Sequence, residues 1–344
     1  MTKILFSNLN SQVKLQAIPS VIYNNSWQRT TPNSWSKVKG KTEFGITAKY
    51  GLTSSISAEA TYNPDFSHIE SDAFQVLINQ RYPIYYSEKR PFFMEAANSF
   101  SIAMGSLGGR GLLSVAHTRN IVDPLWGAKL KGDVQKFSFG FLAPGDEWPG
   151  RELDSLTDGT FINPDEGKIA NFVIGRLKYN LTDKNHVGTI YSGREFAGKY
   201  NRVIGVDANL RFGVGNHLIK ANLLNSFSND NKKTNGVSGN LAYSFTSQAI
   251  EMEWDYEYID PTFEMASAFI NRKGISKYTG LFWYHLYPEG EGLTWLHRFT
   301  PQLFGYYIRD VVSGQIDLLY KGGVNFDFVN NGYLRVEYFY IEEY

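Results

Sequence analysis

Charged residues gather between positions 63 and 111, where the motifs NPDFSHIESD and YSEKRPFFMEAANSF follow each other. Carboxylate oxygens in this number suit a hard cation such as calcium. Alternatively, the basic side chains pair with carboxylates and offset the cost of burial. We favour this second interpretation, in which Pro91, Phe92 and Phe93 anchor the segment by burying aromatic surface. Besides His68, the candidates are Asp65, Glu70, Asp72, Glu88, Lys89, Arg90 and Glu95.

A second acidic set alternates without a break with apolar residues between Ile250 and Tyr258. Successive side chains of a strand point to opposite faces, so this stretch predicts one apolar and one acidic face. A packed core would not accept such charges, whereas a water-filled lumen would. We expect them to line a lumen and to pair with basic residues of the 63–111 segment or with a strand arginine such as Arg211. The acids are Glu251, Glu253, Asp255 and Glu257.

The usual motifs of enzymes and cofactor sites are missing. The sequence has no cysteine, its six histidines lack metal-ligand spacing, and no GxSxG elbow occurs. The glycine-rich stretch 105–111 lacks the GK[ST] ending of a phosphate loop, and we interpret it as a flexible connector. We therefore predict no catalytic residue, metal or cofactor, although an enzyme could assemble its site from separate strands.

Charge and hydropathy restrict the class of protein. Lys plus Arg (34) equals Asp plus Glu (34), so bulk attraction to nucleic acid is not expected. Apolar residues reach 42%, yet the mean hydropathy is −0.31, and no run of about 18 apolar residues could form a spanning helix. A β-barrel is then the architecture that could cross a bilayer. The first residues do not read as a signal peptide, so we expect that a leader was removed or that the chain is an internal piece of a longer protein.

Period-two alternation dominates the chain, as in 44–52, 56–62, 206–212 and 316–340. We count roughly 15–18 strand-like segments joined by short polar turns, many near the ~9–11 residues that a tilted transmembrane strand needs. Tyrosines near strand ends fit interfacial girdles. These patterns predict a single all-β domain over residues 1–344, an antiparallel up-and-down transmembrane β-barrel. Residues 63–111 would form an inserted lumen plug, and 145–167 a long external loop.

Two neighbouring segments carry a family resemblance. NPDFSHIESDAFQV (63–76) and YSEKRPFFMEAANSF (86–100) resemble the hallmark of an uncharacterised outer-membrane barrel family, and weaker matches occur at 127–132, 201–212 and 256–280. Members of that family usually follow a domain similar to family 9 carbohydrate-binding modules. The resemblance implies that this chain is a fragment lacking that domain.

The expected function is that of an outer-membrane channel, transporter or anchoring barrel of a Gram-negative bacterium, linked through the resemblance to glycan binding or uptake. Its expected partners are outer-membrane lipid, the barrel-assembly machinery and a glycan ligand, with no nucleic acid. Two alternatives stay open: a hydrolase with its site on the loop side, and a purely structural docking barrel.

Overall fold

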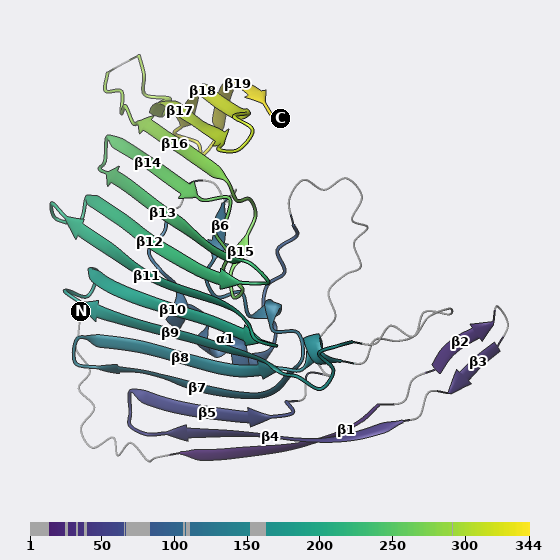
Figure 1. Cartoon of the computed structure of the whole chain (residues 1–344). Helices are drawn as coiled ribbons and strands as arrows, with labels where there is room; N and C mark the ends of the chain where they lie inside the picture. Colours follow the sequence, from purple (N-terminus) through teal and green to yellow (C-terminus); the bar gives the residue numbers. More distant parts are fainter. Residues whose placement is uncertain are drawn as a thin grey trace, which may run out of the picture.

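The computed structural model describes residues 14–24, 27–31, 34–37, 40–64, 66, 83–105, 107, 111–151, 163–290 and 292–344. Within them, 15 strands form one antiparallel sheet whose spatial order follows the chain (Figure 1). In that order they are β1 (Leu15–Asn24), β4 (Lys41–Gly51), β5 (Ile56–Tyr62), β7 (Pro124–Val134), β8 (Phe137–Asp146), β9 (Ala170–Asn180), β10 (His186–Phe196), β11 (Lys199–Phe212), β12 (His217–Asn229), β13 (Lys233–Thr246), β14 (Ile250–Ile259), β16 (Ile275–Tyr284), β17 (Leu296–Asp310), β18 (Ile316–Phe328) and β19 (Tyr333–Glu342).

The remaining elements lie in the connections. A hairpin joins β2 (Trp27–Thr31) to β3 (Ser34–Lys37), and β6 (Leu112–Ser114) pairs with β15 (Phe269–Ile270). The helical elements are α1 (Pro91–Ala97), η1 (Asn98–Phe100), η2 (Thr118–Asn120) and η3 (Trp148–Gly150). No helix in the described ranges is long and apolar enough to cross a membrane.

Tight turns explain the consecutive strand order. Gln135 begins the two-residue turn between β7 and β8 with φ 53°, and Ala197 and Gly198 join β10 to β11 with φ 53° and 79°. Two-residue hairpins favour such left-handed backbone because its twist matches that of the paired strands. Strands joined in this way pair with their predecessors, and strands joined by longer connections, such as β5 and β7, follow the same order.

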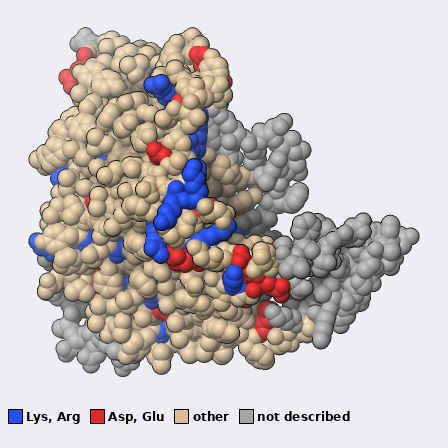
Figure 2. All heavy atoms as spheres, viewed as in Figure 1, with Lys and Arg blue, Asp and Glu red and all other residues tan. Residues whose placement is uncertain are grey.

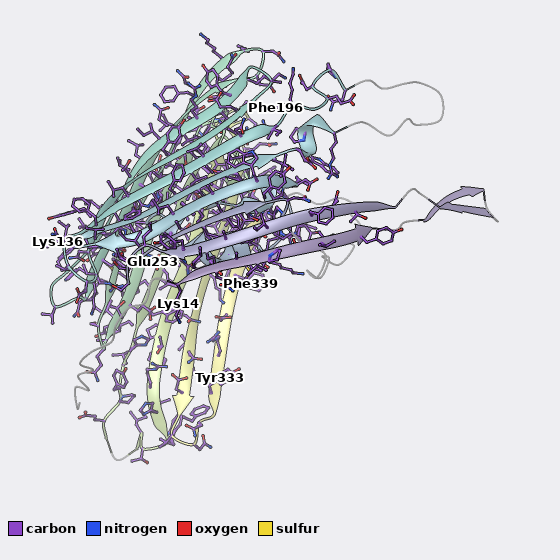
Figure 3. All side chains as sticks on the ribbon, turned by 90° about the horizontal axis from the view of Figure 1, so that it is seen from below. Lys14, Lys136, Phe196, Glu253, Tyr333 and Phe339 are labelled. Carbon is purple, nitrogen blue, oxygen red and sulfur yellow. The ribbon has the colours of Figure 1, made fainter. Side chains whose placement is uncertain are left out.

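The two ends of the sheet differ in the length of their connections. Lys136 and Phe196 mark opposite ends (Figure 3). Apart from 285–295, the end at Lys136 carries short turns, while the insertions 63–123, 147–169 and 260–274 all leave from the other end, which we call the long-loop end (Figure 1). Of the predicted 145–167 loop, residues 152–162 lie outside the described ranges.

The outer face of the sheet is apolar and the inner face is polar, which is the reverse of the arrangement that water would favour. On the outer face, Val206, Leu223 and Leu241 are 56%, 54% and 44% exposed. On the inner face, Asp207 and Asn222, which alternate with them along β11 and β12, are buried. The sheet curls around the insertions, which cover this inner face (Figures 1 and 3).

Two hydrophobic clusters lie between the inner face and the insertions. One packs Phe92, Phe93, Phe100 and Ile121 of the 63–123 insertion against residues of β8 and β9, so the expected burial of Phe92 and Phe93 is confirmed. The other joins residues such as Ile102 and Phe263 to strand residues of β10–β17. The core is thus built on the charged face of the sheet rather than on its apolar face.

The prediction of an all-β, antiparallel, up-and-down sheet is confirmed, and its 15 strands fall within the expected range. In the described part the sheet is open, because β1 is hydrogen-bonded to β4 alone and β19 to β18 alone. The sequence reasoning missed β1, which contains Pro19. Proline lacks the backbone N–H of a central strand, but a strand at the sheet edge accepts it.

Candidate functional site

A stretch of the 63–123 insertion crosses the inner face almost at the level of the strand centres. We call residues 101–105, 107 and 111–112 the crossing segment; residues 106 and 108–110 lie outside the described ranges. Asp207 of β11 accepts a hydrogen bond from the Ala103 N–H at 2.9 Å, and Asn222 of β12 donates to the Ala103 carbonyl at 2.7 Å. Both backbone groups of one residue are therefore held by side chains of neighbouring strands.

The same arrangement continues on both sides of Ala103. Two side chains donate to carbonyls of the segment: Arg176 of β9 to Ser101 at 3.3 Å, and Lys277 of β16 to Leu107 at 3.1 Å. Two others accept from its N–H groups: Asn240 of β13 from Gly105 at 2.8 Å, and Glu257 of β14 from Leu112 at 2.9 Å. An irregular buried segment must satisfy its backbone groups. Here polar side chains of the strands supply these partners, and each of them bonds to one backbone group of the segment.

Two glycines allow this close approach. A Cβ at Gly105 would overlap the Asp255 carboxylate, and a Cβ at Gly111 would overlap the carboxylate of Glu257. The stretch predicted to be a flexible connector is therefore fitted against acids of β14 at both of these described positions. Glycine is required here for space rather than for flexibility.

Buried ion pairs accompany the crossing segment. The Nη2 of Arg176 lies 2.6 Å from the Oδ1 of Asp207, and neither side chain is exposed. Lys277 lies 3.8 Å from Glu257. For Glu257 the ion pair is with Lys277 and not with the expected Arg211, whose guanidinium donates to the Gly215 carbonyl at the short-turn end of the sheet. Lys277 is the partner because β14 and β16 place residues 257 and 277 directly opposite each other.

The four acids of β14 share the inner face, but they differ in their surroundings. Asp255 and Glu257 are buried, and Asp255 accepts from Asn240 at 3.1 Å. Glu251 and Glu253 are half-buried towards the short-turn end. A cavity of about 160 Å³ remains between Asp255, Glu257 and the crossing segment, which is room for a few water molecules.

Glu88 and Arg90 form the second polar cluster of the insertion. They are joined by hydrogen bonds of 2.9 and 2.8 Å, and Arg90 also donates to the carbonyls of Ile121 and Thr118 at 2.7 Å. The Arg90 guanidinium lies 4.4 Å from the ring centre of Phe93. Burial would raise the pKa of Glu88, but the hydrogen bonds and charge of Arg90 outweigh it and hold that pKa at about 2.

Glu95, on α1, belongs to a third cluster. Its carboxylate pairs with Lys49 of β4 and lies 3.7 Å from Lys129 of β7, which in turn is 2.8 Å from Glu59 of β5. Lys129 also donates to the Phe92 carbonyl at 2.7 Å. These contacts attach α1 to three strands of the sheet.

The remaining candidates are placed as follows. Lys89 is half-buried beside Glu88, whose carboxylate accepts its backbone N–H at 3.0 Å. Asp65, His68, Glu70 and Asp72 lie outside the described residues. Among the residues that the structure does describe, no group of His, Asp and Glu side chains could hold a metal ion.

Sequence reasoning missed the strand residues that hold the insertion. The residues not named as site candidates from the sequence are Lys49, Glu59, Lys129, Arg176, Asp207, Asn222, Asn240 and Lys277. Each is a single polar residue at an inward position of an alternating strand. That pattern is also typical of a solvated face, so only the covering insertion distinguishes them.

Fold and site together define a class, namely a large antiparallel β-sheet with an inserted segment held on its charged inner face. Residues 12–104 match a family model described as a domain of unknown function (DUF5916), which confirms the predicted resemblance to an uncharacterised family. The match contains both hallmark motifs and begins before the region in which sequence reasoning placed the resemblance. No curated protein matches the chain.

Proposed function

We propose that this chain forms the wall of an outer-membrane β-barrel, that its insertion occupies the lumen as a plug, and that the plugged barrel is a gated transporter. The observation that carries this proposal is the polarity of the sheet, apolar outside and charged inside. Lipid would contact the outer face, and the barrel-assembly machinery would fold the chain into the membrane.

The outer face supports contact with lipid because its apolar residues are continuous across strands. Val206 and Leu223 are direct neighbours on β11 and β12. Contiguous exposed apolar surface of this extent is rare on proteins in water. Figure 2 shows the strands of this face almost free of charge, with Lys, Arg, Asp and Glu concentrated towards the long-loop end.

Aromatic rings near both strand ends give the outer face the pattern of two girdles. Tyr256, Tyr278 and Tyr307 form a row towards the long-loop end, with ring centres 4.7 and 6.4 Å apart. Phe137 and Tyr179 lie 5.1 Å apart towards the short-turn end. Rings with a polar edge are favoured at the two membrane–water interfaces.

Barrel closure has a geometric requirement. Because all neighbouring strands are antiparallel and the sheet has 15 strands, β1 and β19 run in the same direction. A cylinder with antiparallel pairs throughout therefore needs an odd number of further strands between these two edges.

The crossing segment supports gating rather than an open pore. It is held chiefly by single hydrogen bonds, worth about 0.5–1.5 kcal/mol each for the neutral partners and about 1.5–3 kcal/mol for the charged ones, so a ligand that replaces these partners could displace it. The hydrophobic clusters around Phe93 and Phe263 favour a second candidate, an anchoring barrel whose plug stays in place. The hydrolase alternative receives little support, because the Glu88 carboxylate already forms an ion pair with Arg90. A link to glycans rests on the family resemblance.

Labelling at two adjacent positions of β17 tests the membrane proposal. The chain has no cysteine, so Leu303→Cys and Gln302→Cys each carry one nitroxide label. Leu303 points outward and is 61% exposed, while Gln302 points inward and bonds to Glu337. In proteoliposomes, we expect oxygen dissolved in lipid to relax the label at 303, and a water-soluble nickel complex to relax the label at 302. Equal access of the nickel complex to both labels would refute a lipid-facing outer surface.

Planar-bilayer conductance separates the two candidate functions. A gated transporter should be closed as the wild type and conduct when the crossing segment is loosened by Asn222→Ala and Asn240→Ala together. An anchoring barrel should stay closed in both forms. The matched control is Asn225→Ala, a change of the same kind on the outer side of β12.

A further inference from the structure

A pocket of about 610 Å³ opens at the long-loop end, where the β10–β11 and β12–β13 turns meet residues 263–273. Its charged lining consists of Arg194, Lys199, Arg272 and Lys273 against Asp230 and Glu264. Basic residues therefore outnumber acids, and Figure 2 shows Lys and Arg gathered at this end of the strands. Phe196, which stands at the end of β10 in Figure 3, adds an apolar wall.

Arg194 differs from the other basic residues of the pocket. Lys199 lies 2.5 Å from Asp230, Lys273 lies 3.7 Å from Glu264, and Arg272 lies 3.2 Å from Asp310. Among the residues that the structure describes, the Arg194 guanidinium makes neither an ion pair nor a hydrogen bond. Its central carbon lies over the rings of Phe172 and Phe196, 5.6 and 5.5 Å from their centres, within the range of cation–π contact.

Nearby carboxylates do not take the place of a partner. Asp146 and Asp230 attract Arg194 through space without forming an ion pair with it. Asp146 already accepts N–H bonds from Val122, Asp123 and Trp148 at 3.0, 2.8 and 3.1 Å. The guanidinium, which lines the pocket, therefore has N–H donors that these two carboxylates do not occupy.

We propose that this pocket binds a small organic anion, whose carboxylate or phosphate group forms a two-pronged ion pair with Arg194. The planar fork of arginine matches both oxyanions, and aromatic contacts pre-organise it for that geometry. Lys199 and Lys273 add positive potential, and the pocket volume suits a ligand of small-molecule size. The site does not depend on the proposed membrane function, since its geometry is complete in the chain itself.

Titration calorimetry of the full chain with inorganic phosphate and glycerol 3-phosphate tests the proposal. Arg194→Gln should weaken binding about tenfold or more, because a charged, two-pronged contact is lost. The control is Arg202→Gln on the next strand. Arg202 is also at the long-loop end, but it faces outward and pairs with Glu195 at 2.6 Å, so this variant loses the same charge outside the pocket. Its affinity should stay within about twofold of wild type.

If Arg202→Gln loses as much affinity as Arg194→Gln, the attraction is diffuse and the proposed site is overturned. Unchanged affinity in Arg194→Gln would also overturn it. If Arg194→Gln does not fold, Arg194→Lys is the variant to test. Lysine keeps the positive charge but lacks the two-pronged guanidinium, so affinity should fall about threefold. An unchanged affinity in this variant would overturn the proposal. Flotation with phosphatidylglycerol–phosphatidylcholine vesicles distinguishes the source. Arg194-dependent binding to these vesicles but not to soluble phosphates identifies a lipid headgroup, the reverse identifies a soluble anion, and binding to neither refutes the proposal.

Discussion

Arg176 and Asp207 form a fully buried ion pair on the inner face, 2.6 Å apart, across the strand that lies between β9 and β11. The same two side chains also bond to the backbone of the crossing segment, at Ser101 and Ala103. Arg176 also donates to the Thr189 carbonyl of β10 at 3.0 Å, so one pair of charges joins three strands to the insertion. This coupling leads to the first prediction.

Asp207→Asn should destabilise the protein by about 3–5 kcal/mol, because it leaves the buried Arg176 guanidinium without a counter-charge. Urea unfolding in detergent, followed by circular dichroism, measures the change. The control is Asp230→Asn, which breaks the exposed pair with Lys199 and should cost less than about 1 kcal/mol. Equal effects of the two variants would contradict the importance of burial.

Gly105→Ala should loosen the crossing segment, since the added methyl group would overlap the Asp255 carboxylate. We expect a loss of about 1–3 kcal/mol in stability and faster hydrogen exchange at the amides of Ala103 and Leu112. Gly280→Ala is the matched control, because a Cβ at that outer-face glycine has open space around it. Unchanged exchange at Ala103 in Gly105→Ala would contradict the close fit.

Stability should depend on pH through Glu88. Its pKa is held at about 2 in the folded protein against an ordinary value of 4.5, so the folded state favours the carboxylate. This contribution, about 3 kcal/mol, is fully present above pH 4.5 and is lost as the pH falls towards 2. Unfolding free energies from pH 7 to pH 2 measure it.

The variant Glu88→Gln should be less stable at neutral pH and should lose less stability than wild type on acidification. Glu289→Gln removes an exposed acid in the β16–β17 connection and serves as the control. A wild-type pH profile that Glu88→Gln leaves unchanged would show that Arg90 does not hold this carboxylate.

Charge placed on the outer face should distinguish membrane from water as its surroundings. If lipid covers this face, Leu223→Arg should cost about 2–4 kcal/mol when the protein folds into vesicles. Val312→Arg is the control, because Val312 is 77% exposed in the β17–β18 connection. In water the two substitutions should differ by less than about 0.5 kcal/mol. Equal costs in vesicles would therefore argue against a lipid-facing sheet.

The sequence by itself determined the strands and the face on which each residue lies. Strict alternation from Ile250 to Tyr258 corresponds to β14, with Trp254 outward and Asp255 inward. This succeeds because side-chain direction along a strand depends on the local backbone alone. β1 was one exception, since Pro19 is acceptable there only because neighbouring strands leave it at the edge. Residues 321–323 were a second, because their residue types predict a turn whereas β18 runs through them without a break.

Only the tertiary structure determined what the inward residues do. Sequence reasoning could not show that Asn222 holds Ala103, that Lys277 rather than Arg211 faces Glu257, or that Arg194 lines a pocket without an ion pair to any residue of the described ranges. These relationships depend on strand register and on the path of an insertion across the sheet. Both arise from contacts between residues far apart in the chain, which no local pattern of residue types encodes.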